Sequence, residues 1–78
     1  MTTTYTAVLS GTSSEEIARK VFTTIRVIDC VAWAESYGPP AARCDIYRDD
    51  GSRVAQYIRP QPGSYAAERG VWINAKIA

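Results

Sequence analysis

The segment from Ser14 to Ser36 constrains the fold most, because its apolar residues recur at the spacing of an amphipathic helix. At about 100° per residue, five of them fall within roughly a quarter of the helix circumference. The stripe consists of Ile17, Val21, Ile25, Ile28 and Ala32. We therefore predict one long helix with an apolar side that lies on a sheet.

Signals at both ends support this helix. The run Thr12-Ser13-Ser14-Glu15-Glu16 contains a capping box, and its carboxylates favour the positive end of a helix dipole. Gly38-Pro39-Pro40 is typical of a helix end. The run from Val21 to Val31 is also rich in β-branched residues, which prefer strands. A strand after Phe22 is the alternative, so the sequence leaves both helix and strand as possible structures for residues 23–33.

Four further runs read as strands separated by turn residues. The turn Asp49-Asp50-Gly51 joins two of them, with Gly51 expected at positive φ. The predicted strands are 5–10, 43–48, 53–59 and 71–77, the last with clean alternation of apolar and polar residues. Residues 1–78 are thus expected to form a single α+β domain in the order β-α-β-β-β, with one long helix packed on one face of an antiparallel sheet.

The register of the predicted hairpin decides which side chains face the helix. A three-residue loop places Ile46 opposite Val54 and Ala42 opposite Ile58, which gathers the aliphatic side chains on one face. A two-residue loop would pair Ile46 with Ala55 and split them. We favour the first register, which leaves aromatic and arginine side chains on the face without a helix. These are the predicted partner-binding residues Arg43, Tyr47, Arg53, Tyr57, Arg59 and Trp72. The competing interpretation is that they are ordinary cross-strand pairs.

The residue types present exclude several kinds of chemistry. The chain contains no histidine, so serine–histidine and cysteine–histidine catalysis within one chain are excluded. Cys30 is expected to face away from the apolar stripe and Cys44 to face inward, so we predict two free thiols. The glycines stand singly and form no phosphate-binding loop. We expect no catalytic residues, no cofactor and no metal.

Charge and hydropathy limit the kinds of partner and the cellular location expected for the protein. A net charge of +1 argues against binding based on phosphate neutralisation. No stretch reaches the roughly 18 apolar residues of a membrane span, and the start of the chain lacks the pattern of a signal peptide. We therefore expect a cytoplasmic protein.

The whole-chain plan resembles that of the small phage-encoded anti-CRISPR proteins. The resemblance is carried by the short chain of 78 residues, the start Met1-Thr2-Thr3-Thr4, one capped helix from Ser14 and an antiparallel sheet from Arg43 to Ile77. It implies an inhibitor that binds a bacterial surveillance complex or nuclease, in the cytoplasm of the host cell, and blocks it by covering its surface. It assigns no functional residues.

Two other functions are compatible with the sequence. A small domain that binds single-stranded nucleic acid would stack bases on Tyr47 and Tyr57 with Arg53 nearby. A structural subunit would pair through an edge strand, for which Val71 to Ile77 is the candidate. The protein is accordingly expected as a monomer or a small homo-oligomer.

Overall fold

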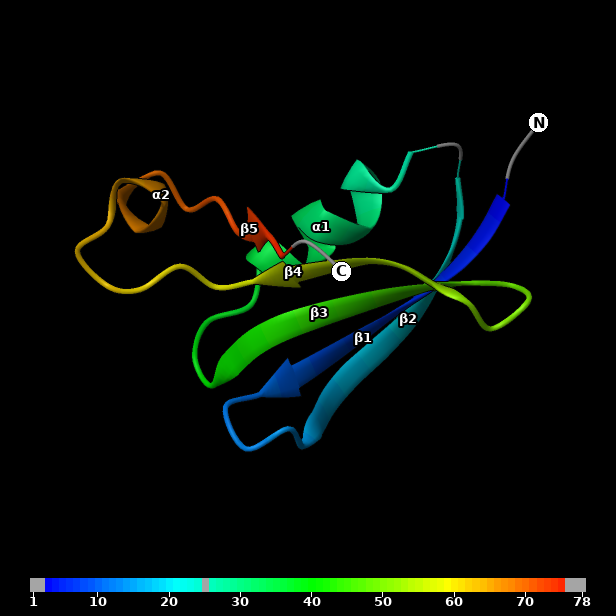
Figure 1. Cartoon of the computed structure of the whole chain (residues 1–78), viewed down its shortest axis with the longest axis horizontal. Coiled ribbons are helices and arrows are strands. Elements are labelled where there is room, and N and C mark those ends of the chain that lie inside the picture. The colour runs from blue at the N-terminus through cyan, green and yellow to red at the C-terminus, as the bar shows by residue number, and fades with distance from the viewer. Residues whose placement is uncertain (1–2, 25, 76–78) are drawn as a thin grey trace.

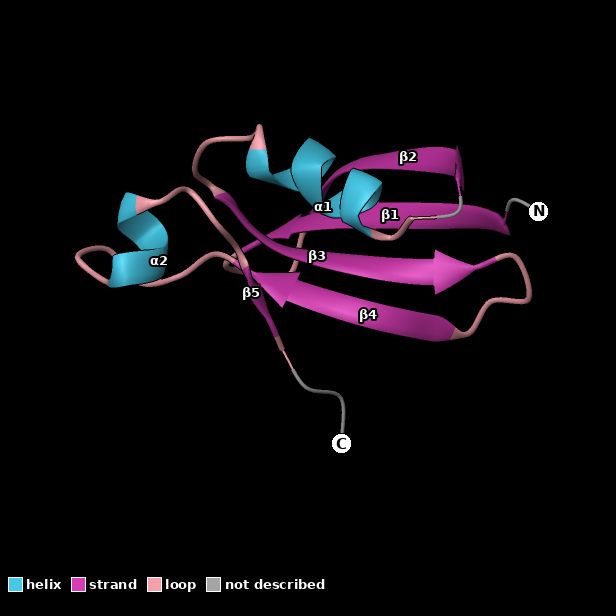
Figure 2. Cartoon of the chain, turned by 90° about the horizontal axis from the view of Figure 1, so that it is seen from above, coloured by secondary structure: helices cyan, strands magenta, loops and turns pink. Residues whose placement is uncertain are grey.

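A five-stranded antiparallel sheet dominates the computed structural model, which describes residues 3–24 and 26–75. A short helix, α1, lies against one face of the sheet (Figures 1 and 2). The strands lie in the order β2-β1-β3-β4-β5. In chain order the elements are β1 (Thr3–Gly11), β2 (Glu16–Thr24), α1 (Ile28–Glu35), β3 (Ala41–Arg48), β4 (Arg53–Ile58), α2 (Tyr65–Glu68) and β5 (Ile73–Asn74).

The prediction of one long helix packed on a sheet is wrong. The run expected to cap that helix forms a hairpin turn, in which Gly11 N–H donates to the Glu15 carbonyl at 2.9 Å and Ser14 N–H to the Gly11 carbonyl at 3.0 Å. Ser14 has a φ of 66°. Serine and threonine are favoured both in turns and at helix caps for one reason. Their hydroxyl groups can form hydrogen bonds with nearby backbone groups, which competes with regular helix. The chain then returns as strand β2 and not as helix.

The apolar stripe is correspondingly divided between two elements. Helix α1 has eight residues and buries Cys30, Val31 and Ala34, whereas Ile28 is 49% exposed. Val21 belongs to β2 and is 60% exposed. The other stripe members Ile17 and Ala32 are also exposed, and Ile25 lies outside the described residues.

Helix α1 crosses over the middle of the sheet. Strands β2 and β3 both pair antiparallel with β1, which lies between them, so β2 and β3 run parallel and α1 connects them across β1. The core lies between α1 and this part of the sheet. Its members include Leu9 of β1, Val31 of α1 and Ile46 of β3, each at most 1% exposed.

The hairpin of β3 and β4 has the expected turn but a different register. Gly51 has a φ of 88°, and Arg48 N–H donates to the Ser52 carbonyl at 2.8 Å, as expected for a three-residue loop. Tyr47 then pairs with Arg53, but Ile46 pairs with Ala55, because a bulge inserts one extra residue in β4. The predicted pairs of Ile46 with Val54 and Ala42 with Ile58 are therefore wrong.

The last predicted strand is also shorter than expected. Strand β5 spans Ile73–Asn74, and Ala75 N–H donates to the Gln56 carbonyl at 2.8 Å. Trp72, directly before it, is only 4% exposed. Lys76 and Ile77, which we placed in this strand, lie outside the described residues.

Candidate functional site

The face of the sheet opposite α1 carries no helix among the residues that the structure describes (Figure 2). Directly opposed residues of neighbouring strands point to the same side, so the registers identify the side chains of this face. We call it the open face. It includes Thr4, Thr6, Val8, Ser10, Arg19, Val21, Thr23, Arg43, Asp45, Tyr47, Arg53, Gln56 and Ile58.

Asp45 is the centre of a polar cluster on the open face. Its Oδ1 accepts from Gln56 Nε2 at 2.7 Å and from Arg53 Nη1 at 3.3 Å, and its Oδ2 accepts from Arg43 Nε at 3.2 Å. The side chain of Asp45 is 8% exposed, against 36% for Arg43 and 39% for Arg53. A carboxylate with so little exposure requires partners for its charge, and the two arginines and the amide supply them. Asp45 thus fixes two half-exposed guanidinium groups in position.

An open hollow of about 590 Å³ adjoins this cluster. Thr6 and Val8 of β1 form its floor, and its rim includes Arg19, Tyr47 and the turn 49–51. The rim is held in part by an ion pair in which Arg19 Nη2 lies 2.7 Å from Glu16 Oε1. The hydrogen bond from Arg19 lowers the pKa of Glu16, so this carboxylate is ionised at neutral pH. The hollow is thus lined by charged and polar side chains of β2, β3 and the turn after it, and by Thr6 and Val8 of β1.

Three of the six predicted partner-binding residues lie together on the open face. The pairing of β3 with β4 places Tyr47 opposite Arg53, and Arg43 lies on the same face four residues before Tyr47, connected to Arg53 through Asp45. Tyr57 is opposite Cys44 and packs against the core on the α1 side of the sheet, because the bulge in β4 reverses its direction. The prediction that Tyr47 and Tyr57 share a face is wrong.

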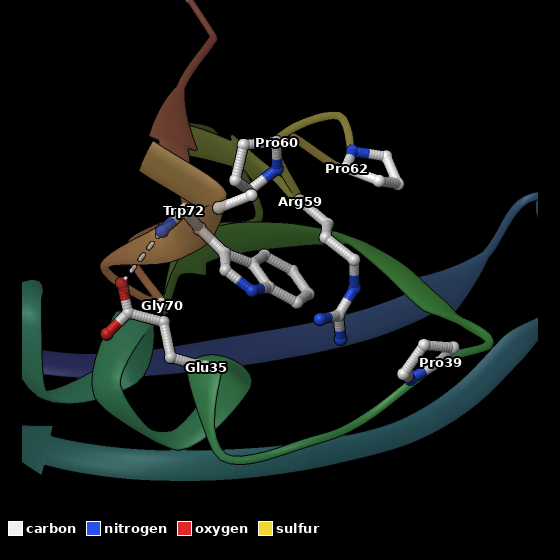
Figure 3. Close-up of a pocket in the computed structure, with 8 residues that line it drawn as sticks. Glu35, Pro39, Arg59, Pro60, Pro62, Gly70 and Trp72 are labelled. Atoms are coloured by element: carbon white, nitrogen blue, oxygen red, sulfur yellow. Dashed lines mark hydrogen bonds between the residues drawn. The ribbon is translucent and has the colours of Figure 1, made fainter. Parts of the chain in front are cut away.

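The remaining two, Arg59 and Trp72, line a second and separate pocket of about 250 Å³ (Figure 3). The guanidinium of Arg59 lies 4.9 Å from the Trp72 ring centroid and donates through Nε to the Ala41 carbonyl at 2.7 Å and through Nη2 to the Tyr37 carbonyl at 2.5 Å. Trp72 N–H donates to Glu35 Oε2 at 2.9 Å. These contacts bind Arg59 and Trp72 to α1, to the loop after it and to the start of β3, so their expected placement on the helix-free face is also wrong.

Sequence reasoning missed several residues of the open face. Arg19 and Val21 were assigned to the predicted helix, and the β-branched run beginning at Val21 was the signal that would have placed them in a strand. Gln56 was missed because the bulge in β4, which turns it toward Asp45, has no evident sequence signal.

The two cysteines are free and buried, and neither is poised as a nucleophile. Burial raises the pKa of the Cys30 thiol to about 11, and that of the Cys44 thiol to about 12. Both are therefore protonated at neutral pH, whereas the thiolate is the reactive form. Cys30 faces the core, contrary to our expectation that it would lie on the outer side of the helix.

Within residues 3–24 and 26–75, no three side chains of the metal-binding types His, Cys, Asp and Glu converge on one point. Within the same residues, no helix has the length and apolar character needed to cross a membrane.

Comparison with known proteins gave no match to a family model, to a curated protein or to a solved structure.

Proposed function

We propose that the protein is a non-enzymatic binding protein that docks on a protein partner through its open face. The observation that carries this proposal is the position of Tyr47, which lines the hollow of about 590 Å³ and lies directly opposite the half-exposed Arg53. Arg43 lies farther along β3 on the same face and is connected to Arg53 through Asp45. Tyrosine and arginine are the residue types that most often dominate the binding energy of protein interfaces.

Asp45 supports this function by holding the two arginines in place before a partner arrives. Arg43 uses Nε and Arg53 uses Nη1 to contact Asp45, and among the described residues their other N–H groups have no hydrogen-bond partner, so they remain for a partner's carboxylates or carbonyls. Side chains that are already ordered lose less conformational entropy on binding. The open face therefore has the pre-organisation expected of a docking surface.

The partner that we propose is a bacterial CRISPR-Cas surveillance complex or nuclease, met in the host cytoplasm and inhibited by coverage of its surface. The support for this target is the resemblance in chain length and in the threonine-rich start. The helix from Ser14, which also belonged to that resemblance, is replaced by a hairpin turn and β2. Inhibition by coverage needs a binding face and no catalytic group, and the open face is such a surface.

The geometry favours this function over binding of single-stranded nucleic acid. Base stacking on a sheet commonly uses two or more rings on one face. Tyr47 lies on the open face, but Tyr57 packs toward the core on the other side. The two-ring platform that the sequence suggested is therefore not formed.

The test compares two tyrosine variants in binding and inhibition assays. Purified wild-type protein is titrated onto immobilised CRISPR effector complexes of several types, and DNA cleavage by each complex is followed. We expect Tyr47→Ala to weaken binding by about tenfold or more, which corresponds to roughly 1.4 kcal/mol or more. The matched control is Tyr65→Ala on α2, where the tyrosine is 73% exposed and lies outside the open face.

Equal affinity of Tyr47→Ala and wild type would show that the open face is not the docking surface. Binding to no effector complex would overturn the proposed target. Tight binding of labelled single-stranded oligonucleotides at physiological salt would favour the nucleic-acid function instead.

A further inference from the structure

Strand β2 is a long edge strand. It has nine residues, Glu16–Thr24, and pairs with β1 on one side only among the described strands. Figure 1 shows it at one border of the sheet, at the opposite end of the strand order from the two-residue β5. The outer N–H and C=O groups of an edge strand are a template for another strand. The edge at β5, which corresponds to the sequence-based candidate, offers far less length for pairing.

The middle of this strand exposes an aliphatic side chain. Val21 is 60% exposed, more than any other large aliphatic side chain in the described residues. It stands next to Lys20 and Phe22, whose ammonium nitrogen and ring centroid are 5.2 Å apart. Removal of Val21 from water would be favourable in proportion to the area covered.

We propose that two copies of the chain associate through β2, as antiparallel strands related by a two-fold axis that passes beside Val21. A two-fold axis perpendicular to the sheet keeps both α1 helices on one side of the joined sheet. The side chains of directly opposed residues then point to the same side of the sheet. The axis must therefore pass beside one residue of β2 that lies directly opposite the same residue of the second copy. The position of this residue fixes the register.

The charges of β2 eliminate the neighbouring registers. An axis beside Arg19 or beside Lys20 would place like charges directly opposite each other, which is destabilising. An axis beside Val21 instead places Lys20 opposite the Phe22 of the second copy and Arg19 opposite its Thr23. The Lys20–Phe22 contact seen within one chain can then form across the interface twice, as a cation–π pair.

The remaining registers differ in how many residues of the regular part of β2 they pair. The pairing of β2 with β1 shifts between Leu9 and Ser10, which places a bulge before Ala18. An axis beside Val21 uses the whole regular part of β2, residues 18–24. An axis beside Ala18 would have to run through the bulge, and one beside Phe22 would pair only residues 20–24. The register on Val21 is thus the longest one without opposed like charges.

This association would join the two sheets into one. Both open faces would then lie on the same side of the joined sheet, and both α1 helices on the other. The inference rests on β2 alone and does not depend on the identity of any partner of the open face.

The first experiment measures molecular mass by sedimentation equilibrium over a range of protein concentrations. We expect wild type to reach twice the chain mass of 8.6 kDa at high concentration. Val21→Lys should remain monomeric at the same concentrations, because it places two ammonium groups at the axis. The matched control Val71→Lys changes an exposed valine outside β2 and should dimerise as wild type does. Circular dichroism of each variant checks that the fold is retained.

Wild type that stays monomeric throughout, or Val21→Lys that dimerises like wild type, would overturn the proposal. Loss of the dimer in both valine variants would place the interface elsewhere.

The second experiment tests the register by disulfide trapping. Directly opposed residues have Cβ atoms about 4.5–5.5 Å apart, close to the distance of about 3.5–4.5 Å across a disulfide. With oxygen and copper–phenanthroline as the oxidant, Val21→Cys should form a covalent dimer, seen on a non-reducing gel. Thr23→Cys should not, because it faces Arg19 of the second copy. The native Cys30 and Cys44 are both 0% exposed and do not compete. Faster trapping through residue 23 than through residue 21 would overturn the register.

Discussion

Ser14 and Gly51 hold the same position in two hairpin turns. The N–H of Ser14 donates to the Gly11 carbonyl at 3.0 Å, and that of Gly51 to the Arg48 carbonyl at 2.9 Å. Both residues have positive φ, 66° for Ser14 and 88° for Gly51. Glycine adopts this conformation without strain, whereas a residue with a Cβ atom does not. Ser14 is therefore a strained residue at a position that suits glycine.

Substitution at these two positions should have opposite effects on stability. We expect Ser14→Gly to raise the free energy of unfolding by about 0.5–1 kcal/mol, since relief of the left-handed strain exceeds the added entropy of glycine in the unfolded chain. We expect Gly51→Ser to lower it by about 1 kcal/mol. A Cβ at Gly51 would meet no atom within 4 Å, so its cost is conformational alone. Urea unfolding measures both, and changes of the same sign would contradict this account.

At the scale of elements, the sequence predicted three strands well and the helix poorly. Residues 5–10, 43–48 and 53–59 were expected to be extended, and they correspond to β1, β3 and β4. Their alternation of side chains, and the Gly51 turn between the last two, favour strands over a helix. Ile17 and Val21, in contrast, are four residues apart, and this spacing places side chains on one face of a helix and also on one face of a strand. The helical pattern was therefore ambiguous where the chain forms β2.

The candidate site was only partly predictable for a related reason. The turn at Gly51 was evident, and it brings Arg53 opposite Tyr47. The bulge beyond it is set by packing against the core, where Ala55 and Tyr57 lie, and this depends on partners distant in sequence. A shift of one residue exchanges the two faces of a strand, so the predicted direction of Tyr57 was reversed.

Packing of α1 on β3 should make stability depend on pH in the alkaline range. Cys30 of α1 and Cys44 of β3 are fully buried, and burial raises the pKa of Cys30 to about 11 and that of Cys44 to about 12, from 9.0. In the unfolded chain these thiols ionise near their ordinary pKa, while the folded chain keeps them protonated. Their contribution to stability is therefore complete below pH 9.0 and is lost as the pH rises toward the folded-state values.

The measurement is urea unfolding of wild type and of the double variant Cys30→Ala/Cys44→Ala from pH about 8 to about 10.5. All other residues are identical in the two proteins, so the difference between them isolates the thiols. We expect the unfolding free energy of wild type to fall more steeply with pH than that of the double variant. A constant difference over this range would contradict the burial of the two thiols.

At the scale of the whole molecule, the last described segment of the chain is joined to the rest by the buried Trp72 side chain and by a few polar contacts. We call residues 59–75 the C-terminal arm. Its strand β5 has only two residues, but Arg59 donates to the carbonyls of Tyr37 and Ala41, and Trp72 N–H donates to Glu35. These bonds connect residues between 18 and 37 positions apart in the sequence. The arm should therefore open locally while the sheet and α1 remain folded.

Arg59→Lys tests whether the arm is such a unit. A lysine ammonium lacks the planar fork that lets Arg59 reach two carbonyls while it lies over the Trp72 ring. We expect a loss of about 1.5–3 kcal/mol in the local stability of the arm, which is the range for hydrogen bonds to charged groups. By native-state hydrogen exchange, the Trp72 amide should then exchange roughly 10- to 100-fold faster. The Leu9 amide, in the central strands, should exchange at the wild-type rate.

Arg69→Lys is the matched control, because Arg69 donates to the exposed Tyr65 hydroxyl at 2.9 Å and lies over that ring within the arm itself. It should leave the Trp72 amide unchanged. If Arg59→Lys accelerated exchange at Leu9 and Trp72 equally, the arm and the sheet would unfold as one cooperative unit, and Arg59 would then stabilise the whole fold and not only the attachment of the arm.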